Sequence, residues 1–208
     1  MYLPAAFAET DLTKLHRFIE QNSFGLLVSQ VDGVLFATHL PFLLERTAGL
    51  YGTLVGHMAR ANPQWGKAAG QTALTIFSGP HAYISPTWYE AENVVPTWNY
   101  TAVHAYGQVE LVEDKAALLN IVQKMVHFYE QALPRPWSFD PSSAYAERML
   151  AQIVGIRIGI EKIEGKWKLN QNHPVERRKH VVGALRQRHD ENAQAIAAMM
   201  QAMLPVEG

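Results

Sequence analysis

Short turns connect the strand-like segments in the first third of the chain, and this spacing restricts the folds it can adopt. Residues 24–29 and 34–44 read as strands on either side of Asp32-Gly33, a pair that tolerates the positive φ angles of a tight hairpin. Residues 50–55 follow as a third strand with no helical pattern before them. Parallel neighbours need crossovers of about a dozen residues or more, so the pattern favours antiparallel pairing over a doubly wound parallel sheet.

Strand and helix patterns alternate along the rest of the chain. Strands are predicted at 72–77, 102–112 and 154–160, the last leading into a hairpin that turns at Gly165-Lys166, and helices at 9–21, 62–69, 114–131 and 142–151. Residues 79–101 read as a long aromatic loop, and loops of this length are more often functional than ornamental. The elements predict a mainly β fold with flanking helices (α+β), built as an antiparallel barrel that is closed or nearly closed.

The chain has 208 residues, which suits one domain or a domain with a small appendage. After Pro174 the pattern becomes helical, with helices predicted over 174–189 and 190–204. We therefore expect a barrel domain over residues 1–173. Residues 174–208 would form a C-terminal helical hairpin, packed on the barrel or on a partner subunit.

Composition and charge limit the classes of function. The net charge is −1, so no global positive field attracts nucleic acid or an anionic membrane. The chain has no cysteine, which excludes disulfides, thiolate catalysis and zinc–sulfur sites. The start, Met1-Tyr2-Leu3-Pro4, lacks the pattern of a signal peptide, and no apolar run approaches the roughly 18 residues of a membrane span. We expect a cytoplasmic protein with no membrane partner.

Polar and aromatic side chains gather between His39 and Gly107, in segments that otherwise read as sheet. Four of the nine histidines fall there, namely His39, His57, His81 and His104, together with Arg60, Asn62, Trp98 and Asn99. A core needs none of these polar groups, and burying each unpaired costs roughly 1–3 kcal/mol. Their density indicates a binding site for a flat, polar ligand that can carry a phosphate.

Several familiar chemistries lack their motifs. The chain has no Gly-x-Gly-x-x-Gly motif and no phosphate-binding loop. It also has no Gly-x-Ser-x-Gly elbow, since Ile76 stands two positions before Ser78 where that motif needs glycine. The four histidines show no i,i+2 or i,i+4 pair. Hydrogen-bonded or half-buried histidines are therefore favoured over a metal centre.

A phosphorylated aromatic ligand fits the residues better. Arg60 offers a fork-shaped cation, and the amides of the helix start at Asn62-Pro63 favour an anion. His57 can add a donor. Candidates for the edge of a heterocycle are Thr38, Ser78, Asn99, Gln171 and Asn172. Taken alone, Arg60 reads as a surface salt bridge and Trp98 as packing, so the interpretation rests on their combination with His57 and Asn62.

Five motifs resemble the PaiB family and occur in the family's order. They are Thr38-His39-Leu40-Pro41, the ten residues Gly56 to Trp65, the run Phe77 to Tyr89, the segment Val95 to Tyr100, and Lys168-Leu169-Asn170-Gln171-Asn172. The family is described as FMN-binding negative transcriptional regulators. The resemblance implies an FMN-binding split barrel, shared with pyridoxamine phosphate oxidases, which forms homodimers with FMN at the subunit interface.

The resemblance also implies roles for residues. The segment around Arg60, with His57, Met58, Ala59 and Asn62, would hold the phosphate. Thr38, His39, Leu40, Ser78 and Gly79 would line the flavin or its ribityl chain. Trp98, Asn99, Lys168 and Gln171 would approach the ring, with Asn172 beside them. Related oxidases place two basic residues side by side at the phosphate, whereas Ala59 precedes Arg60 here, and His57 would substitute for the missing cation.

Three functional hypotheses stay open. The first is an FMN-dependent regulator that acts through DNA or a protein, with a possible DNA contact along the basic stretch Arg177–Arg188, although a solvated helix face is the favoured interpretation of that stretch. The second is an FMN-dependent oxidoreductase with flavin N5 chemistry and a proton from His39 or His104. The third is a haem-binding split barrel with His39, His81 or His104 as iron ligand.

Overall fold

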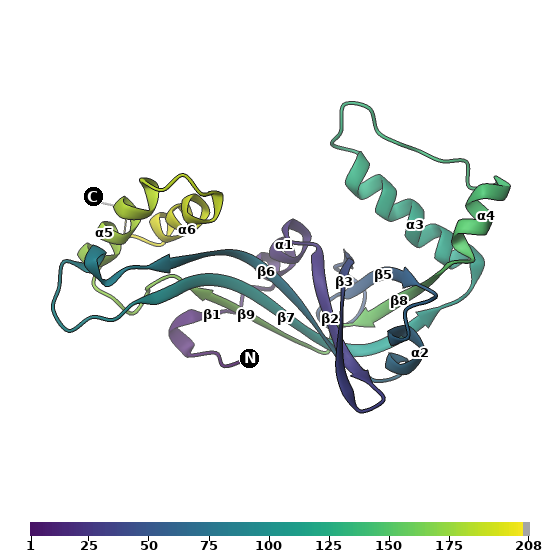
Figure 1. Ribbon diagram of the computed structural model, residues 1–208, viewed down its shortest axis with the longest axis horizontal. Coiled ribbons are helices and arrows are strands. Elements are labelled where there is room, and N and C mark those ends of the chain that lie inside the picture. Colours follow the sequence, from purple (N-terminus) through teal and green to yellow (C-terminus); the bar gives the residue numbers. More distant parts are fainter. Residues whose placement is uncertain (206–208) are drawn as a thin grey trace. The chain divides into compact units, whose positions relative to one another are not determined.

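The computed structural model describes residues 1–205 and has nine strands and six α-helices in that range (Figure 1). The strands are β1 (Ala8–Glu9), β2 (Phe24–Val31), β3 (Val34–Pro41), β4 (Leu43–Glu45), β5 (Thr53–Ala59), β6 (Thr72–Ile84), β7 (Thr97–Val112), β8 (Ile153–Gly159) and β9 (Lys162–Lys168). The helices are α1 (Leu12–Gln21), α2 (Gln64–Ala68), α3 (Lys115–Glu130), α4 (Ala144–Leu150), α5 (Val175–Arg186) and α6 (Glu191–Ala202), and the short 3₁₀ turns are η1 (Ala5–Phe7) and η2 (Pro86–Tyr89).

The chain divides into two compact units, each with its own packing. Unit 1 contains Met1–Leu15, Ser78–Val103 and the chain from Glu164 onward, and unit 2 contains His16–Phe77 and His104–Ile163. The long strands β6 and β7 therefore contribute residues to both units. The expected boundary between residues 173 and 174 stays a prediction. In unit 1 the C-terminal helices pack with strand residues 82 and 84 in one core.

Unit 2 is built from antiparallel pairs. β2 pairs with β3 along its whole length, from Phe24 opposite Pro41 to Val31 opposite Val34. The hairpin turn lies at Asp32 (φ 51°) and Gly33 (φ 81°), which confirms the turn predicted from that pair. On the other side β2 pairs with β6, while β5 pairs with β4 and β8, and β8 with β7.

The core of unit 2 lies between the sheet and its helices. Phe42 and Phe77 meet edge to face, with ring centroids 6.1 Å apart. Helix α3 places the buried Ile121 and Met125 against Val55 of β5. Asp114 caps this helix by accepting from the amide of Ala117, which is the arrangement that helix starts favour.

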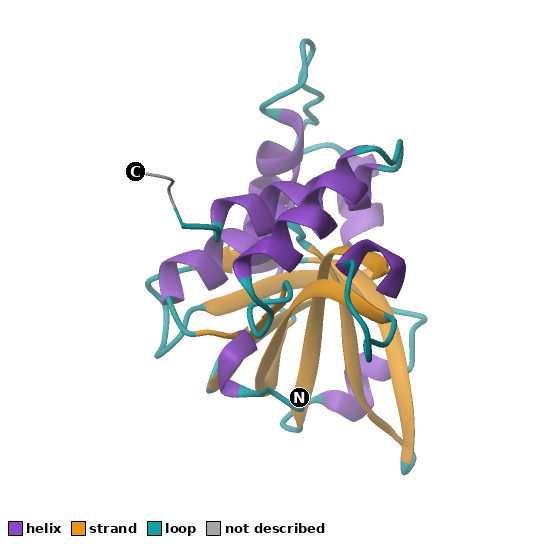
Figure 2. Ribbon diagram, turned by 90° about the vertical axis from the view of Figure 1, so that its left-hand side faces the viewer, coloured by secondary structure: helices purple, strands orange, loops and turns teal. Residues whose placement is uncertain are grey.

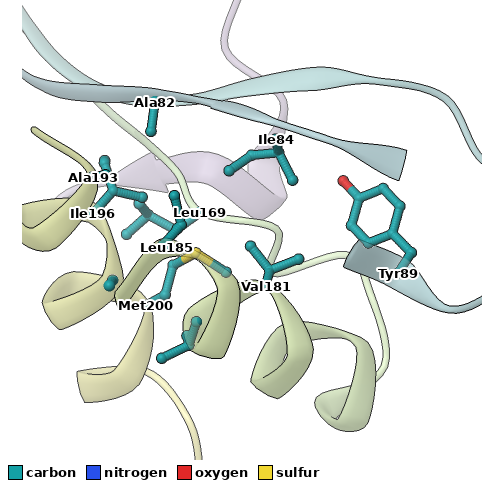
Figure 3. Close-up of a cluster of buried hydrophobic side chains, with 11 residues drawn as sticks. Ala82, Ile84, Tyr89, Leu169, Val181, Leu185, Ala193, Ile196 and Met200 are labelled. Atoms are coloured by element: carbon teal, nitrogen blue, oxygen red, sulfur yellow. The ribbon is translucent and has the colours of Figure 1, made fainter. Parts of the chain in front are cut away.

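The core of unit 1 forms where α5 and α6 lie side by side (Figures 1 and 2). Buried side chains from both helices pack against Ala82 and Ile84 of β6 and against Leu169 (Figure 3). The α6 helix begins at an Asp190 cap that accepts from the amide of Ala193. The mainly antiparallel sheet with flanking helices and a C-terminal helical pair agrees with the predicted fold class.

Two local expectations were wrong. The loop predicted over residues 79–101 is largely strand: β6 continues to Ile84 and β7 starts at Thr97, leaving only residues 85–96 between them. Pro80 lies inside β6, where its carbonyl accepts from the hydroxyl of Thr101, at 3.4 Å, across to β7. Prolines and aromatic rings suggested a loop, but β6 and β7 are neighbouring strands of the sheet and β7 also pairs with β9.

The predicted C-terminal hairpin does not form among the described residues, because β9 pairs with β1 and β7, whereas β8 pairs with β5 and β7. β8 ends at Gly159 and β9 begins at Lys162, so Gly165-Lys166 lies inside β9. A Cβ atom at Gly165 would come within 2.2 Å of Leu15 Cδ2 and 3.0 Å of the carbonyl oxygen of Glu9. The glycine therefore serves the close approach of β1 and the start of α1, which sequence alone does not distinguish from a turn.

Candidate functional site

The candidate residues of unit 2 lie on β3, on β5 and in the turn after β5. The structure brings Thr38 and Asn62 together, because Asn62 Nδ2 donates to Thr38 Oγ1 at 3.0 Å. His39 is exposed and its ring stacks on Phe24, with centroids 5.8 Å apart. Leu40 and Met58 are buried in the core. Their side chains therefore support the surface that a ligand would contact.

His57 has the most unusual environment in unit 2. It lies on β5 opposite Gly155 of β8. Its Nδ1 is buried and has no hydrogen-bond partner among residues 1–205. Burial lowers the pKa of His57 below its usual value, so the ring is neutral at physiological pH. An unsatisfied neutral imidazole nitrogen is a group that a ligand can satisfy.

Arg60 is already engaged by the protein. Its Nε donates to the carbonyl of Ala151 and its Nη2 to that of Ile153, each at 3.1 Å. Its Nη1 lies 3.9 Å from Glu113 Oε1, and the guanidinium stands 5.8 Å from the centroid of Trp65. Arg60 therefore ties the turn after β5 to the start of β8 and keeps part of its donor fork for a ligand.

The helix start at Asn62-Pro63 is also occupied. Asn62 Oδ1 accepts from the amide of Gln64 at 2.9 Å, and α2 is only five residues long. Gln64 is fully buried, and its Nε2 donates to the carbonyls of Leu27 and Phe36 and to Ser29 Oγ. Sequence reasoning missed Gln64, which holds α2 against β2 and β3 and so positions Asn62.

The candidate residues of unit 1 lie on β6, β7 and the end of β9. Ser78 and Gly79 are part of β6. Trp98 is half exposed, with its ring centroid 5.9 Å from His81 and 6.1 Å from Tyr83. Asn99 is fully buried, and its Nδ2 lies 3.3 Å from Met200 Sδ while Oδ1 has no partner among the described residues.

The end of β9 brings two of these candidates together. Lys168 Nζ donates to the carbonyl of Trp98 at 2.6 Å and also to Thr97 Oγ1. Gln171 closes the turn after the strand, since its Oε1 accepts from the amide of Leu169 at 2.7 Å and its Nε2 donates to the carbonyl of Trp167. Gln171 therefore shapes the loop that carries Asn172.

A cavity of about 370 Å³ in unit 1 contains Lys168 and Asn172. It is lined by Phe7, Tyr89, Asn93, Val94, Val95, Thr97, Lys168, Asn170, Asn172, His173 and Arg177. Sequence reasoning missed Tyr89, His173 and Arg177 as site residues. The unbroken polar run from Asn170 to His173 just before a helix could have identified His173, but it does not include Tyr89 or Arg177.

The described residues meet neither the requirements of a metal site nor those of a membrane-spanning helix. Within residues 1–205 no group of three or more histidine or acidic side chains is arranged to hold a metal ion. None of the helices in the same range combines the length and apolar character needed to cross a bilayer.

Comparison with known proteins identifies the family. The family model described as "Putative FMN-binding domain" matches residues 1–162. The chain belongs to this family. It is also 38% identical over 203 residues to the protease synthase and sporulation protein PAI 2 of Bacillus subtilis, with 97% of each chain covered. These matches confirm the resemblance to the PaiB family and identify FMN as the cofactor of the chain's family.

Solved structures show the same fold at low sequence identity. The flavocytochrome Anf3 of Azotobacter vinelandii has a TM-score of 0.61 at 16% identity, covering 77% of this chain and 69% of that one. The FAD and heme binding protein of Mycobacterium smegmatis has a TM-score of 0.57 at 14% identity, covering 77% and 73%. The chain therefore has a split-barrel-like antiparallel sheet with flanking helices.

Proposed function

We propose that this protein binds FMN as a homodimer and acts as a negative regulator of gene expression in the cytoplasm. The observation that carries the proposal is the match to the FMN-binding family over residues 1–162, together with 38% identity to PAI 2 along 97% of both chains. The name of that relative contains the terms protease synthase and sporulation, and the second term supports a regulatory role over a metabolic one.

The residues of unit 2 fit a flavin nucleotide in chemical terms. His57 carries a buried nitrogen without a partner among the described residues, and Thr38 and Asn62 form a hydrogen-bonded polar pair. We assign the phosphate end to His57, Arg60 and Asn62, with Met58 and Ala59 contributing backbone. A bound flavin supplies one- and two-electron redox chemistry at its ring, while the protein binds and orients it.

The remaining candidates serve the other end of the ligand in this proposal. Thr38, His39, Leu40, Ser78 and Gly79 line the flavin or its ribityl chain, and Trp98, Asn99, Lys168, Gln171 and Asn172 approach the ring. The pKa of Lys168 is lowered by burial and by the neighbouring Lys166. A cation whose charge is poorly compensated favours an electron-rich partner such as a reduced or anionic flavin ring.

The outer face of the β2–β3 hairpin supports the homodimer. The alternating register puts Phe24, Leu26, Val28, Leu35 and Ala37 on one face of the two paired strands. Phe24 is 66% exposed and Leu35 is 73% exposed. β3 is at one end of the strand order, and an exposed apolar face beside an edge strand is typical of an interaction surface.

Direct DNA binding through Arg177–Arg188 receives less support. Arg178 is buried and donates to the carbonyl of Met203 at 2.7 Å. Arg188 pairs with Asp190 at 2.8 Å, and Lys179 pairs with Glu176 at 3.2 Å. Since phosphate contacts need a concentrated positive surface, regulation through a protein partner suits this stretch better.

A spectroscopic experiment tests the proposal and separates it from its alternatives. The purified protein should be yellow, with FMN released on denaturation, and should not reduce its flavin at catalytic rates with NADH or NADPH under anaerobic conditions. Rapid bleaching by a nicotinamide would favour the flavin oxidoreductase. The two solved structures include proteins named for haem, so a Soret band on haem titration, lost in a His39, His81 or His104 variant, would favour the haem-binding reading.

A further inference from the structure

The cavity of unit 1 is rich in hydrogen-bond donors. It lies between the loop after η2 and the segment that joins β9 to α5, and its lining includes Lys168, His173 and Arg177 but no Asp or Glu. In the described part of the chain, neither Lys168 nor Arg177 forms an ion pair with a carboxylate. Two positive charges therefore face the cavity without a compensating negative one.

The contact between Arg177 and His173 defines the protonation of the imidazole. Arg177 Nη1 lies 3.0 Å from His173 Nδ1. A guanidinium has no acceptor, so it donates and His173 Nδ1 accepts. The pKa of His173 is lowered by burial and further by Arg177 and Lys168. The ring is therefore neutral with its proton on Nε2, which makes that nitrogen a further donor.

Lys168 is held in place by neutral acceptors. Its Nζ donates to Thr97 Oγ1 and to the carbonyl of Trp98. An ammonium group has three donors. These two contacts orient the group, leave one N–H free for a ligand, and do not neutralise the positive charge, because both acceptors are neutral. An anion in the cavity would make charge-assisted hydrogen bonds with Lys168 and Arg177, which are stronger than bonds between neutral groups.

An aromatic wall completes the cavity. The Arg177 guanidinium stands 5.4 Å from the Tyr89 ring centroid, and the His173 ring stacks on Tyr89 with centroids 5.1 Å apart. Asn170 Nδ2 donates to Tyr89 Oη at 3.1 Å, so the ring is fixed at one end of the hydrophobic cluster in Figure 3. Val94 and Val95 add apolar lining.

We propose that this cavity is a second ligand site, which binds a small phosphate monoester with an apolar body. Arg177, Lys168 and Nε2 of His173 hold the phosphate, and Tyr89, Val94 and Val95 contact the body. A phosphate monoester carries a charge of roughly −1.5 to −2 at neutral pH, which matches the two uncompensated cations. A cavity of about 370 Å³ is near the small end of the range for ligand pockets.

Titration calorimetry with phenyl phosphate on the protein as purified tests this site. We expect saturable binding that is at least about tenfold tighter than for inorganic phosphate or benzoate. Inorganic phosphate lacks the apolar body, and benzoate has a single negative charge in place of the phosphate group. Arg177→Gln should weaken the binding of phenyl phosphate about tenfold or more, the scale of a lost charged hydrogen bond. Arg186→Gln, on the same helix but outside the cavity, should change it less than about twofold.

Other outcomes would overturn the proposal. If wild type and Arg177→Gln bind phenyl phosphate with equal affinity, Arg177 does not hold a phosphate and the proposed site is wrong. If benzoate binds as tightly as phenyl phosphate does, the ligand is not specifically a phosphate. Circular dichroism checks that Arg177→Gln is folded. If it is not, Arg177→Lys keeps the cation without the fork and should still bind several-fold more weakly, and unchanged affinity there would count against the site.

FMN absorbance recorded during the titration separates this site from the flavin site. Lys168 and Asn172 are also candidates for the flavin ring, so release of FMN in proportion to bound phenyl phosphate would identify the cavity as part of the flavin site and overturn a second one. Arg177-dependent binding to a protein that carries no FMN would support the cavity, even though the proposed FMN function would then fail.

Discussion

His57 illustrates how a single residue can couple ligand binding, burial and pH. Burial lowers its pKa, so the folded protein takes up a proton at His57 less readily than the unfolded chain does. Between the unfolded and folded pKa values the unfolded state binds more protons, and stability therefore falls as pH falls below about 6.5. Above that pH, His57 is neutral in both the folded and the unfolded state and does not lower the stability.

We expect the free energy of unfolding of His57→Gln to depend less on pH than that of the wild type. Denaturant titrations at pH values from about 7 down to about 5 measure this slope. His39→Gln replaces an exposed histidine of β3 and controls for the loss of any imidazole from these strands. Identical slopes for His57→Gln and wild type would show that the buried ring does not resist protonation.

Arg60→Ala tests two roles of Arg60, which two separate measurements distinguish. Arg60→Ala should weaken FMN binding by about 2 kcal/mol, the scale of a lost charge-assisted contact. It should also lower stability without ligand, because its hydrogen bonds to the carbonyls of Ala151 and Ile153 are lost. Calorimetry with FMN and denaturant unfolding measure the two effects.

Lys115→Ala provides the matched control for Arg60→Ala. Arg60 and Lys115 both line a cavity of about 220 Å³. Lys115 pairs with Glu147 at the surface, so its loss should change FMN affinity by less than about 1 kcal/mol. If Arg60→Ala binds FMN as tightly as the wild type does, the phosphate assignment is wrong and Arg60 serves only the turn.

At the scale of elements, β9 depends on a glycine that allows two segments to approach it. Gly165→Ala should destabilise the protein by roughly 1–3 kcal/mol, the usual cost of overpacking, because the new Cβ would overlap Leu15 and the backbone of Glu9. Gly159→Ala adds the same atom to β8, where nothing lies within 4 Å. Denaturant midpoints compare the two variants, and an equal effect of both would contradict the steric argument.

The paired strands β2 and β3 show how register creates a surface. Side chains alternate between faces of a strand, so a hairpin with Phe24 opposite Pro41 and Gln30 opposite Leu35 collects apolar residues on its outer face. The same alternation puts Leu27 fully in the core. A one-residue slip would exchange these faces, and the turn at Asp32-Gly33 prevents it.

At the scale of the whole molecule, the proposed dimer depends on that outer face. Leu35→Lys should convert the protein to a monomer in sedimentation experiments, because it buries a charge in an apolar interface, which costs several kcal/mol. Leu133→Lys changes another exposed leucine, which is 50% exposed and lies after α3, and it should leave the dimer intact. A dimer that survives Leu35→Lys, or a monomeric wild type, would exclude this face as the interface.

Sequence alone determined the features that depend on neighbours in the chain. The Asp32-Gly33 turn, the helix over Lys115–Glu130 and the antiparallel class follow from local φ preferences, capping and periodicity, all of which act over a few residues. The family motifs likewise led to FMN before any coordinates. The sequence also predicted Arg60, Lys168 and Gln171 as site residues, but it did not indicate which residues they contact.

Only the tertiary structure decided where distant segments meet. β6 and β7 extend through prolines and aromatic residues because each has a strand beside it, and Gly165 lies inside a strand because Leu15 and Glu9 pack against it. The cavity of Arg177, His173 and Tyr89 joins residues that are 84 to 88 positions apart in the chain. The energy of such contacts depends on burial and distance in space, which local patterns do not encode.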